Sequence, residues 1–186
     1  MNTRQALLAA ASEVIADSGW HAASSRTVAA RAGVPLGAIT YHFGGKDALL
    51  REAALGELHS MFATPWQIME TSTELAELVH RMLDWSHSAD VTARQQAVLL
   101  ELMVRARHDP ETAAGLGAGL AAYRAQLVAS LARVGKRGND EIPAAAAQAF
   151  AAQCTGTFLH FMIDPTYPTG PAAEAAGLAW ITALRA

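Results

Sequence analysis

Alanine dominates this sequence and supplies 42 of its 186 residues. It favours helix because it loses no side-chain rotamer freedom when the backbone becomes helical. Apolar and small residues also recur at steps of three and four, as Leu7, Ala11, Val14 and Ser18 do over residues 3–18. No segment shows the two-residue alternation that is typical of a strand. We therefore expect an all-α protein of about nine helices.

The composition excludes several classes of protein. With 52% hydrophobic and 17% charged residues, the chain has enough apolar surface for a globular core. Its one cysteine, Cys154, cannot form an internal disulfide. No run of about 20 residues is apolar enough for a membrane span. Glu13 and Asp17 interrupt any apolar core of a signal peptide. These features predict a cytoplasmic protein with no membrane partner.

Charge is unevenly distributed along the chain. Residues 1–51 hold five basic and three acidic side chains, whereas residues 52–186 hold nine basic and fourteen acidic ones, which gives +2 and −5. This asymmetry is typical of a small module that faces a polyanion and is attached to a body that does not. Chance variation among surface charges is the alternative interpretation.

The segment between Ser24 and Gly45 predicts two short helices joined by a tight turn. Ser24 or Ser25 can cap the first helix, Gly33 supplies the turn, and Leu36 to Phe43 form the second helix. Within the second helix Ile39 and Phe43 lie on the inner side, which leaves Gly37, Thr40 and Tyr41 on the outer side. This is helix-turn-helix geometry, in which the second helix enters the major groove of DNA.

These residues resemble a known family. Val28-Ala29, Ala32-Gly33-Val34, the run from Gly37 to Phe43 and Lys46-Asp47-Ala48-Leu49 are similar to the TetR family of transcriptional repressors, over roughly residues 3–50. The resemblance implies a three-helix DNA-binding domain over residues 1–46, followed by a helical ligand-binding and dimerisation domain over residues 47–186. It further implies a dimeric repressor that binds a palindromic operator and is released by a small-molecule inducer.

The resemblance also implies which residues contact DNA. Tyr41, His42 and Lys46 would contact phosphates, while Thr40 would reach a base edge. The full set is Ser25, Arg26, Leu36, Gly37, Thr40, Tyr41, His42 and Lys46. Two departures stand out: Pro35 replaces a frequent serine, and residues 36–42 contain no Arg, Lys, Asn or Gln. Base readout would therefore depend on Thr40, on apolar contacts and on DNA shape, with Arg26 as a supplement.

The remainder of the chain offers candidates for an effector site and a dimer interface. Methionine, cysteine and aromatic side chains can line an adaptable apolar cavity for a largely apolar effector. The candidates are Phe62, Trp66, Met82, Trp85, Met103, Tyr123, Phe150, Cys154 and Phe158. Small residues of the last two helices would allow close approach of a second subunit. They are Ala145, Ala149, Ala152, Ala172, Ala176, Ala179 and Ala183, with Leu159 and Trp180 as larger anchors. Both sets would equally suit a packed monomer core.

The rival hypothesis is a small helical enzyme or binding protein that uses the cavity of the C-terminal domain. An enzyme would need a paired acid and base, which the sequence does not offer. His80 and His87 are seven residues apart and could share a face, but no third metal ligand is near them. Cys154 is interpreted as a buried helical cysteine. We expect no catalytic residues, no metal and no cofactor.

Overall fold

Helices make up the described part of the chain, which comprises residues 2–87, 91–135, 144–164, 166, 170, 172–174 and 176–177 of a computed structural model. Within these residues there is no strand, so the expected all-α fold is confirmed. Nine helices have bounds within the described residues: α1 (Thr3–Ser18), α2 (Ser25–Ala32), α3 (Gly37–Phe43), α4 (Lys46–Met61), α5 (Ala63–Thr71), α6 (Leu75–Ser86), α7 (Ala93–Ala106), α8 (Pro110–Val134) and α9 (Ala144–Ile163).

Local capping signals fix several of these helix ends. The Asn2 side chain accepts a hydrogen bond from the backbone N–H of Gln5 (2.9 Å), and the Gln5 side chain accepts one from the Asn2 N–H (3.2 Å). Thr92 and Gln95 form the same reciprocal arrangement at the start of α7. Such pairs satisfy N–H groups that the first turn of a helix leaves without partners.

Proline positions also agree with the helix boundaries, with one difference. The helix predicted to start at Asp109-Pro110 begins at Pro110 and ends at the expected Val134. Pro65 was expected to interrupt the helix after Lys46, but α4 already ends at Met61 and Pro65 lies in the first turn of α5. Proline fits there because a first turn has no use for its missing N–H. Residues 136–143, Pro165 and most of the predicted last helix (172–184) lie outside the described residues.

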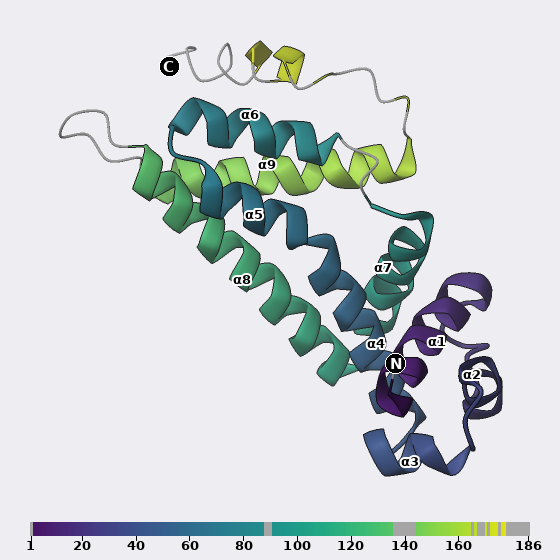
Figure 1. Cartoon of the computed structure of the whole chain (residues 1–186). Helices are drawn as coiled ribbons and strands as arrows, with labels where there is room; N and C mark the ends of the chain where they lie inside the picture. The colour runs from purple at the N-terminus through teal and green to yellow at the C-terminus, as the bar shows by residue number, and fades with distance from the viewer. Residues whose placement is uncertain are drawn as a thin grey trace. The chain divides into compact units, whose positions relative to one another are not determined.

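The first of two structural units comprises residues 1–62 and 91–121. In it α1 packs against α2, α4 and α7, and α3 packs against α4 (Figure 1). The buried stripe of α1 supplies much of the core, because Leu7, Ala11, Val14 and Ile15 are fully buried. The other helices add Val28, Ala29, Ile39, Leu49, Leu50, Ala54, Val98 and Leu102.

The second unit comprises residues 63–90 and 122–186. Here α6 packs against both α5 and α9. Its core contains Met69, Leu78, Met82, Leu83, Tyr123, Leu127, Ala151 and Cys154. This structural division differs from the functional boundary predicted after residue 46, which stays a prediction. No helix in the described ranges is both long and apolar enough to span a lipid bilayer.

Candidate functional site

The turn between α2 and α3 has the geometry that the sequence predicts. Ser24 is the N-cap of α2, and its Oγ accepts from the backbone N–H of Thr27 (3.1 Å). Ser25, the predicted phosphate contact, is therefore the first residue of α2 rather than its cap. Gly33 ends α2 at a φ of 66°, a left-handed conformation in which a side chain would be strained. Val34 then donates its N–H to the Ala29 carbonyl (3.1 Å) and closes the turn.

The two faces of α3 differ sharply in exposure. Ile39 is only 2% exposed, whereas Tyr41 is 85% exposed and Thr40 is also exposed. The predicted inward position of Ile39 and outward position of Tyr41 are confirmed. Leu36, just before α3, is 49% exposed as well. The helix thus presents a solvent-facing edge while one apolar side chain anchors it from below.

Aromatic contacts hold the C-terminal half of this edge in place. The Tyr41 and His42 rings meet edge to face, with centroids 4.8 Å apart and an interplanar angle of 84°. His42 in turn contacts Phe43 at 6.3 Å, and the Arg4 guanidinium lies 5.0 Å from the Phe43 ring centroid. Arg4 was not among the predicted site residues, because its place beside α3 depends on how α1 folds back.

Internal ion pairs use much of the positive charge expected to face a polyanion. Arg31 lies 3.0 Å from Asp17 and 3.4 Å from Glu13, and its hydrogen bond to Asp17, reinforced by that to Glu13, raises the pKa of the guanidinium. Arg4 pairs with Glu52 at 2.5 Å. The surplus of +2 therefore overstates the charge that is available to a ligand.

Two of the predicted cationic side chains, Arg26 and Lys46, are better placed than Arg31 to contact DNA. Arg26 is exposed on α2 and forms no ion pair with any residue that the structure describes. The Nζ of Lys46 is 3.8 Å from the Asp47 carboxylate, and the Lys46 side chain is 36% exposed. Arg26 is consequently the least neutralised cation on the two helices of the motif.

Most of the predicted effector residues form part of the core of the second unit. Trp85 stacks on Phe158 with centroids 5.3 Å apart and an interplanar angle of 3°. Met82, Tyr123 and Cys154 are buried, while Trp66 and Phe150 are half-buried. Phe62 and Met103 instead belong to the first unit, where Met103 is 41% exposed. An apolar stripe in the sequence does not show which helix will pack against it. The predicted effector set therefore includes residues from both units.

Sequence reasoning missed a buried polar cluster in the same unit. The side chains of His87 and Glu174 are each only 8% exposed, and their Nε2 and Oε2 atoms are 3.2 Å apart. Gln153 and Thr157 donate hydrogen bonds to the other carboxylate oxygen, Oε1. From the sequence, His87 is a candidate only for a metal site shared with His80. His87, Gln153 and Glu174 lie far apart in sequence, so no local motif indicates the cluster.

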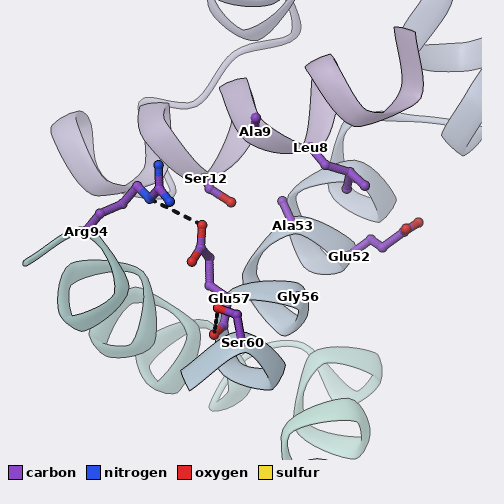
Figure 2. A pocket seen from close by; sticks show the side chains of 9 residues that line it. All are labelled: Leu8, Ala9, Ser12, Glu52, Ala53, Gly56, Glu57, Ser60 and Arg94. Atoms are coloured by element: carbon purple, nitrogen blue, oxygen red, sulfur yellow. Dashed lines mark hydrogen bonds and ion pairs between the residues drawn. The ribbon is translucent and has the colours of Figure 1, made fainter. Parts of the chain in front are cut away.

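A recess of about 310 Å³ lies between α1, α4 and α7 of the first unit (Figure 2). Its lining includes Ala9, Ala53 and Gly56, which carry little or no side chain. The Glu57 carboxylate, 12% exposed, is paired with Arg94 at 3.4 Å. None of the predicted effector residues lines this recess.

Comparison with known proteins agrees with the helix-turn-helix geometry. The family model of the bacterial regulatory proteins of the tetR family matches residues 7–53, and that of the tetracyclin repressor-like C-terminal domain matches residues 70–183. The nicotine-responsive transcriptional repressor HdnoR of Paenarthrobacter nicotinovorans is 27% identical over 173 residues, which cover 90% of this chain and 88% of HdnoR.

Two further proteins extend the comparison. The transcriptional regulator UidR of Escherichia coli (strain K12) is 26% identical over 114 residues, which cover 61% of this chain and 57% of UidR. The crystal structure of SCO7518 from Streptomyces coelicolor A3(2), described as a transcriptional regulator, is 27% identical with a TM-score of 0.80 and covers 97% of this chain and 98% of that one. Because the matched models span most of the chain, it belongs to the TetR family of DNA-binding transcriptional regulators.

Proposed function

We propose that this regulator is a dimeric repressor that binds a palindromic operator in the cytoplasm and is released by a small-molecule effector. The single observation that carries the DNA-binding half of the proposal is the edge of α3. There Thr40 and Tyr41 are exposed over the buried Ile39. An exposed edge above an anchored inner face is what insertion into the major groove needs.

The chemistry of this edge favours contacts to the DNA backbone. Tyr41, His42 and Lys46 would contact phosphates, and Thr40 would reach a base edge. Residues 36–42 lack the side chains that usually read guanine and adenine. Sequence preference would then come largely from apolar contacts by Leu36 and from the shape of the DNA.

A surface on α9 supports the proposed dimer. Ala145, Ala149 and Ala152 are exposed there. Ala149 and Ala152 border a groove of about 490 Å³, together with Gly156 and His160. Small exposed residues at these spacings let a second helix approach closely. A two-fold axis would then match a palindromic operator. Of the other predicted contacts, Ala172 and Ala176 are exposed and Leu159 is half-buried, whereas Ala179, Trp180 and Ala183 lie outside the described residues.

An effector would act through the second unit. HdnoR is named as responsive to nicotine, which supports a small organic molecule as the kind of effector. The buried side chains around Trp85 and Phe158 supply the apolar surface that such a molecule needs. We propose that effector binding tilts α4 from Lys46 onward and so changes the spacing of the two α3 helices. A coupling free energy of about 1–3 kcal/mol changes DNA affinity roughly 5- to 150-fold.

A gel-shift measurement on the DNA upstream of its own gene tests the proposal. The wild-type protein should bind in a sequence-preferring and salt-sensitive manner. Tyr41→Ala should weaken binding about tenfold, because it removes a hydrogen bond to a charged phosphate. Leu100→Ala, which truncates a 48% exposed side chain on α7, is the matched control and should bind as the wild type does. Equal affinity of all three proteins, or binding that ignores salt, would overturn the proposed site.

A further inference from the structure

Helix α8 carries three glycines, Gly115, Gly117 and Gly119, near its start. Glycine is a poor helix former because it loses more backbone freedom on folding than any other residue. Three of them within five positions therefore call for a compensating gain in the packing. All three belong to the first structural unit, as does the whole of α4.

Two of these glycines lie directly against leucine side chains of α4. A Cβ atom on Gly115 would lie 2.6 Å from Cδ1 and 3.3 Å from Cδ2 of Leu55, although nonbonded carbon atoms prefer about 3.5–4.0 Å. A Cβ atom on Gly119 would lie 3.2 Å from Cδ2 of the buried Leu58. On Gly117 it would meet no atom of another helix within 4 Å in the described part of the chain. Gly115 and Gly119 therefore form a seat for the two leucines, and glycine keeps this seat open.

Ion pairs join the same two helices beside the seat. Arg51 of α4 lies 3.3 Å from Asp109 and 2.5 Å from Glu111 at the start of α8. Arg51 comes four residues before Leu55 on α4. Glu111 likewise comes four residues before Gly115 on α8. Positions four apart share one face of a helix, so the ion pairs and the seat follow each other along two helices that run in the same direction.

The seat connects the DNA-binding helices to the rest of the chain. Only two residues separate α3 from α4, and α3 packs against α4. A change in the position of α4 therefore carries α3 with it. Beyond residue 121, α8 continues into the second unit, where the same four-residue step from Gly119 brings the buried Tyr123 and Leu127. Glycine occupies this stripe of α8 only in the part that contacts α4.

We propose that Gly115 and Gly119 are positioning residues for DNA binding, because the depth at which Leu55 enters the seat sets the position of α4 and hence of α3. The seated arrangement binds DNA, and an arrangement in which Leu55 has left the seat does not. The apparent DNA affinity is then the intrinsic affinity multiplied by the seated fraction. This inference rests on the proposed function for its DNA measurement, whereas the packing of the seat is measurable without DNA.

Gel shifts with the full-length protein and the upstream DNA compare three alanine variants of α8. Gly115→Ala should weaken binding about five- to tenfold, because the added methyl group displaces Leu55. Gly119→Ala should weaken it about two- to threefold, since Leu58 lies farther from the added group. Gly117→Ala is the matched control and should bind as the wild type does. Helix propensity rises equally in all three variants, so only contact with α4 distinguishes them.

Two further measurements separate positioning from the loss of a DNA contact. A smaller seated fraction lowers the affinity equally at every salt concentration, so Gly115→Ala should keep the salt slope of the wild type. Leu55→Val added to Gly115→Ala conserves the number of side-chain carbons and removes the Cδ atoms that the methyl group meets. This double variant should bind within about twofold of the wild type. Leu55→Val alone should weaken binding less than Gly115→Ala does.

Equal DNA affinity of Gly115→Ala and Gly117→Ala would overturn the proposal. A loss that Leu55→Val does not restore, or a shallower salt slope in Gly115→Ala, would overturn it as well. Melting temperature without DNA, at a fixed protein concentration, measures the seat separately: Gly115→Ala should melt below Gly117→Ala, and adding Leu55→Val should reduce the difference. Equal melting temperatures would contradict the seat whatever the DNA result. Failure of the wild type to bind the upstream DNA would instead contradict the proposed function.

Discussion

The two units differ in how far their paired charged side chains are exposed to water. In the first unit Arg31 pairs with Glu13 and Asp17, and all three side chains are more than 40% exposed. In the second unit His87 and Glu174 are each 8% exposed. Water screens the first group, so its contribution to stability is small. Desolvation makes the second group expensive, and a buried pair of this kind is weak evidence for stability alone.

The difference teaches where to look for function in each unit. In the first unit the pairs determine which cations remain available to DNA, so an unpaired arginine matters more than the net charge. In the second unit the His87–Glu174 pair is enclosed, so its charge is not available to a partner at the surface. The predictions below test this contrast, starting with the largest expected effect.

The first prediction concerns Glu101, a partly buried carboxylate that breaks the pattern of the first unit. One of its oxygens accepts the backbone N–H of Trp20 at 2.8 Å, just after α1 ends. Glu101→Ala should lower the free energy of unfolding by about 2–3 kcal/mol, because it leaves that N–H without its charged acceptor. Urea unfolding at a fixed protein concentration measures this. Glu101→Gln keeps an acceptor and should lose less. A loss in Glu101→Ala no greater than that of an exposed substitution would show that Glu101 is not a structural carboxylate.

The second prediction compares two arginines of α2. Arg26 is exposed without an ion pair among the described residues, whereas Arg31 is held by two carboxylates. Arg26→Gln should weaken DNA binding and lower the salt dependence by about one unit of slope, because one phosphate contact is lost. Arg31→Gln removes the same charge from the same helix and should change neither quantity appreciably. Gel shifts over a salt series measure both slopes. Equal slopes in the two variants would mean that the ion pairs of Arg31 do not withhold its charge from DNA.

Local signals made the first unit easy to predict. The periodic stripe of α1, the serine cap of α2 and the turn at Gly33 each act within a few residues, so their consequences could be derived from the sequence. The inward Ile39 and outward Tyr41 follow from the same period. These features gave the helix bounds of the motif and the exposed edge of α3.

Contacts between distant residues could not be predicted in this way. Glu101 reaches Trp20 across 81 positions in the sequence, and nothing near either residue indicates the other. The His87–Glu174 pair depends on how a C-terminal segment returns to the end of α6. For a similar reason, the sequence did not show which of the predicted effector residues are buried in the second unit and which belong to the first. Met103 and Met82 both lie on apolar stripes, but only the packing shows that one is exposed and the other buried.

The third prediction uses pH to test the ion pairs of Asp109 with Arg51 and Arg105. The Asp109 side chain is 13% exposed, which lies between the exposure of the Arg31 group and that of the His87–Glu174 pair. Asp109 precedes α8, and its pKa is held below the usual range, chiefly by the hydrogen bond from the Thr112 hydroxyl (2.7 Å). The Glu111 N–H and the charges of Arg105 and Arg51 also lower it. A carboxylate with a lowered pKa stabilises the folded state above its unfolded pKa of about 3.9, and this contribution is lost as the pH falls through the folded value.

Melting temperature measured from neutral pH down to about pH 3 should therefore show the Asp109 network as an acid-side loss of stability. Asp109→Asn should melt lower at neutral pH and vary less below about pH 4, because no titrating carboxylate remains there. Thr112→Val removes the largest cause of the lowered pKa, so its acid-side loss should be smaller than that of the wild type and complete at a higher pH. Asp47→Asn removes a charge from an exposed side chain on α4 and reports the effect of charge alone. Parallel curves for the wild type, Asp109→Asn and Thr112→Val would show that this network behaves like the screened pairs of Arg31. The contrast between exposed and enclosed charge would then hold only between the two units and not within the first.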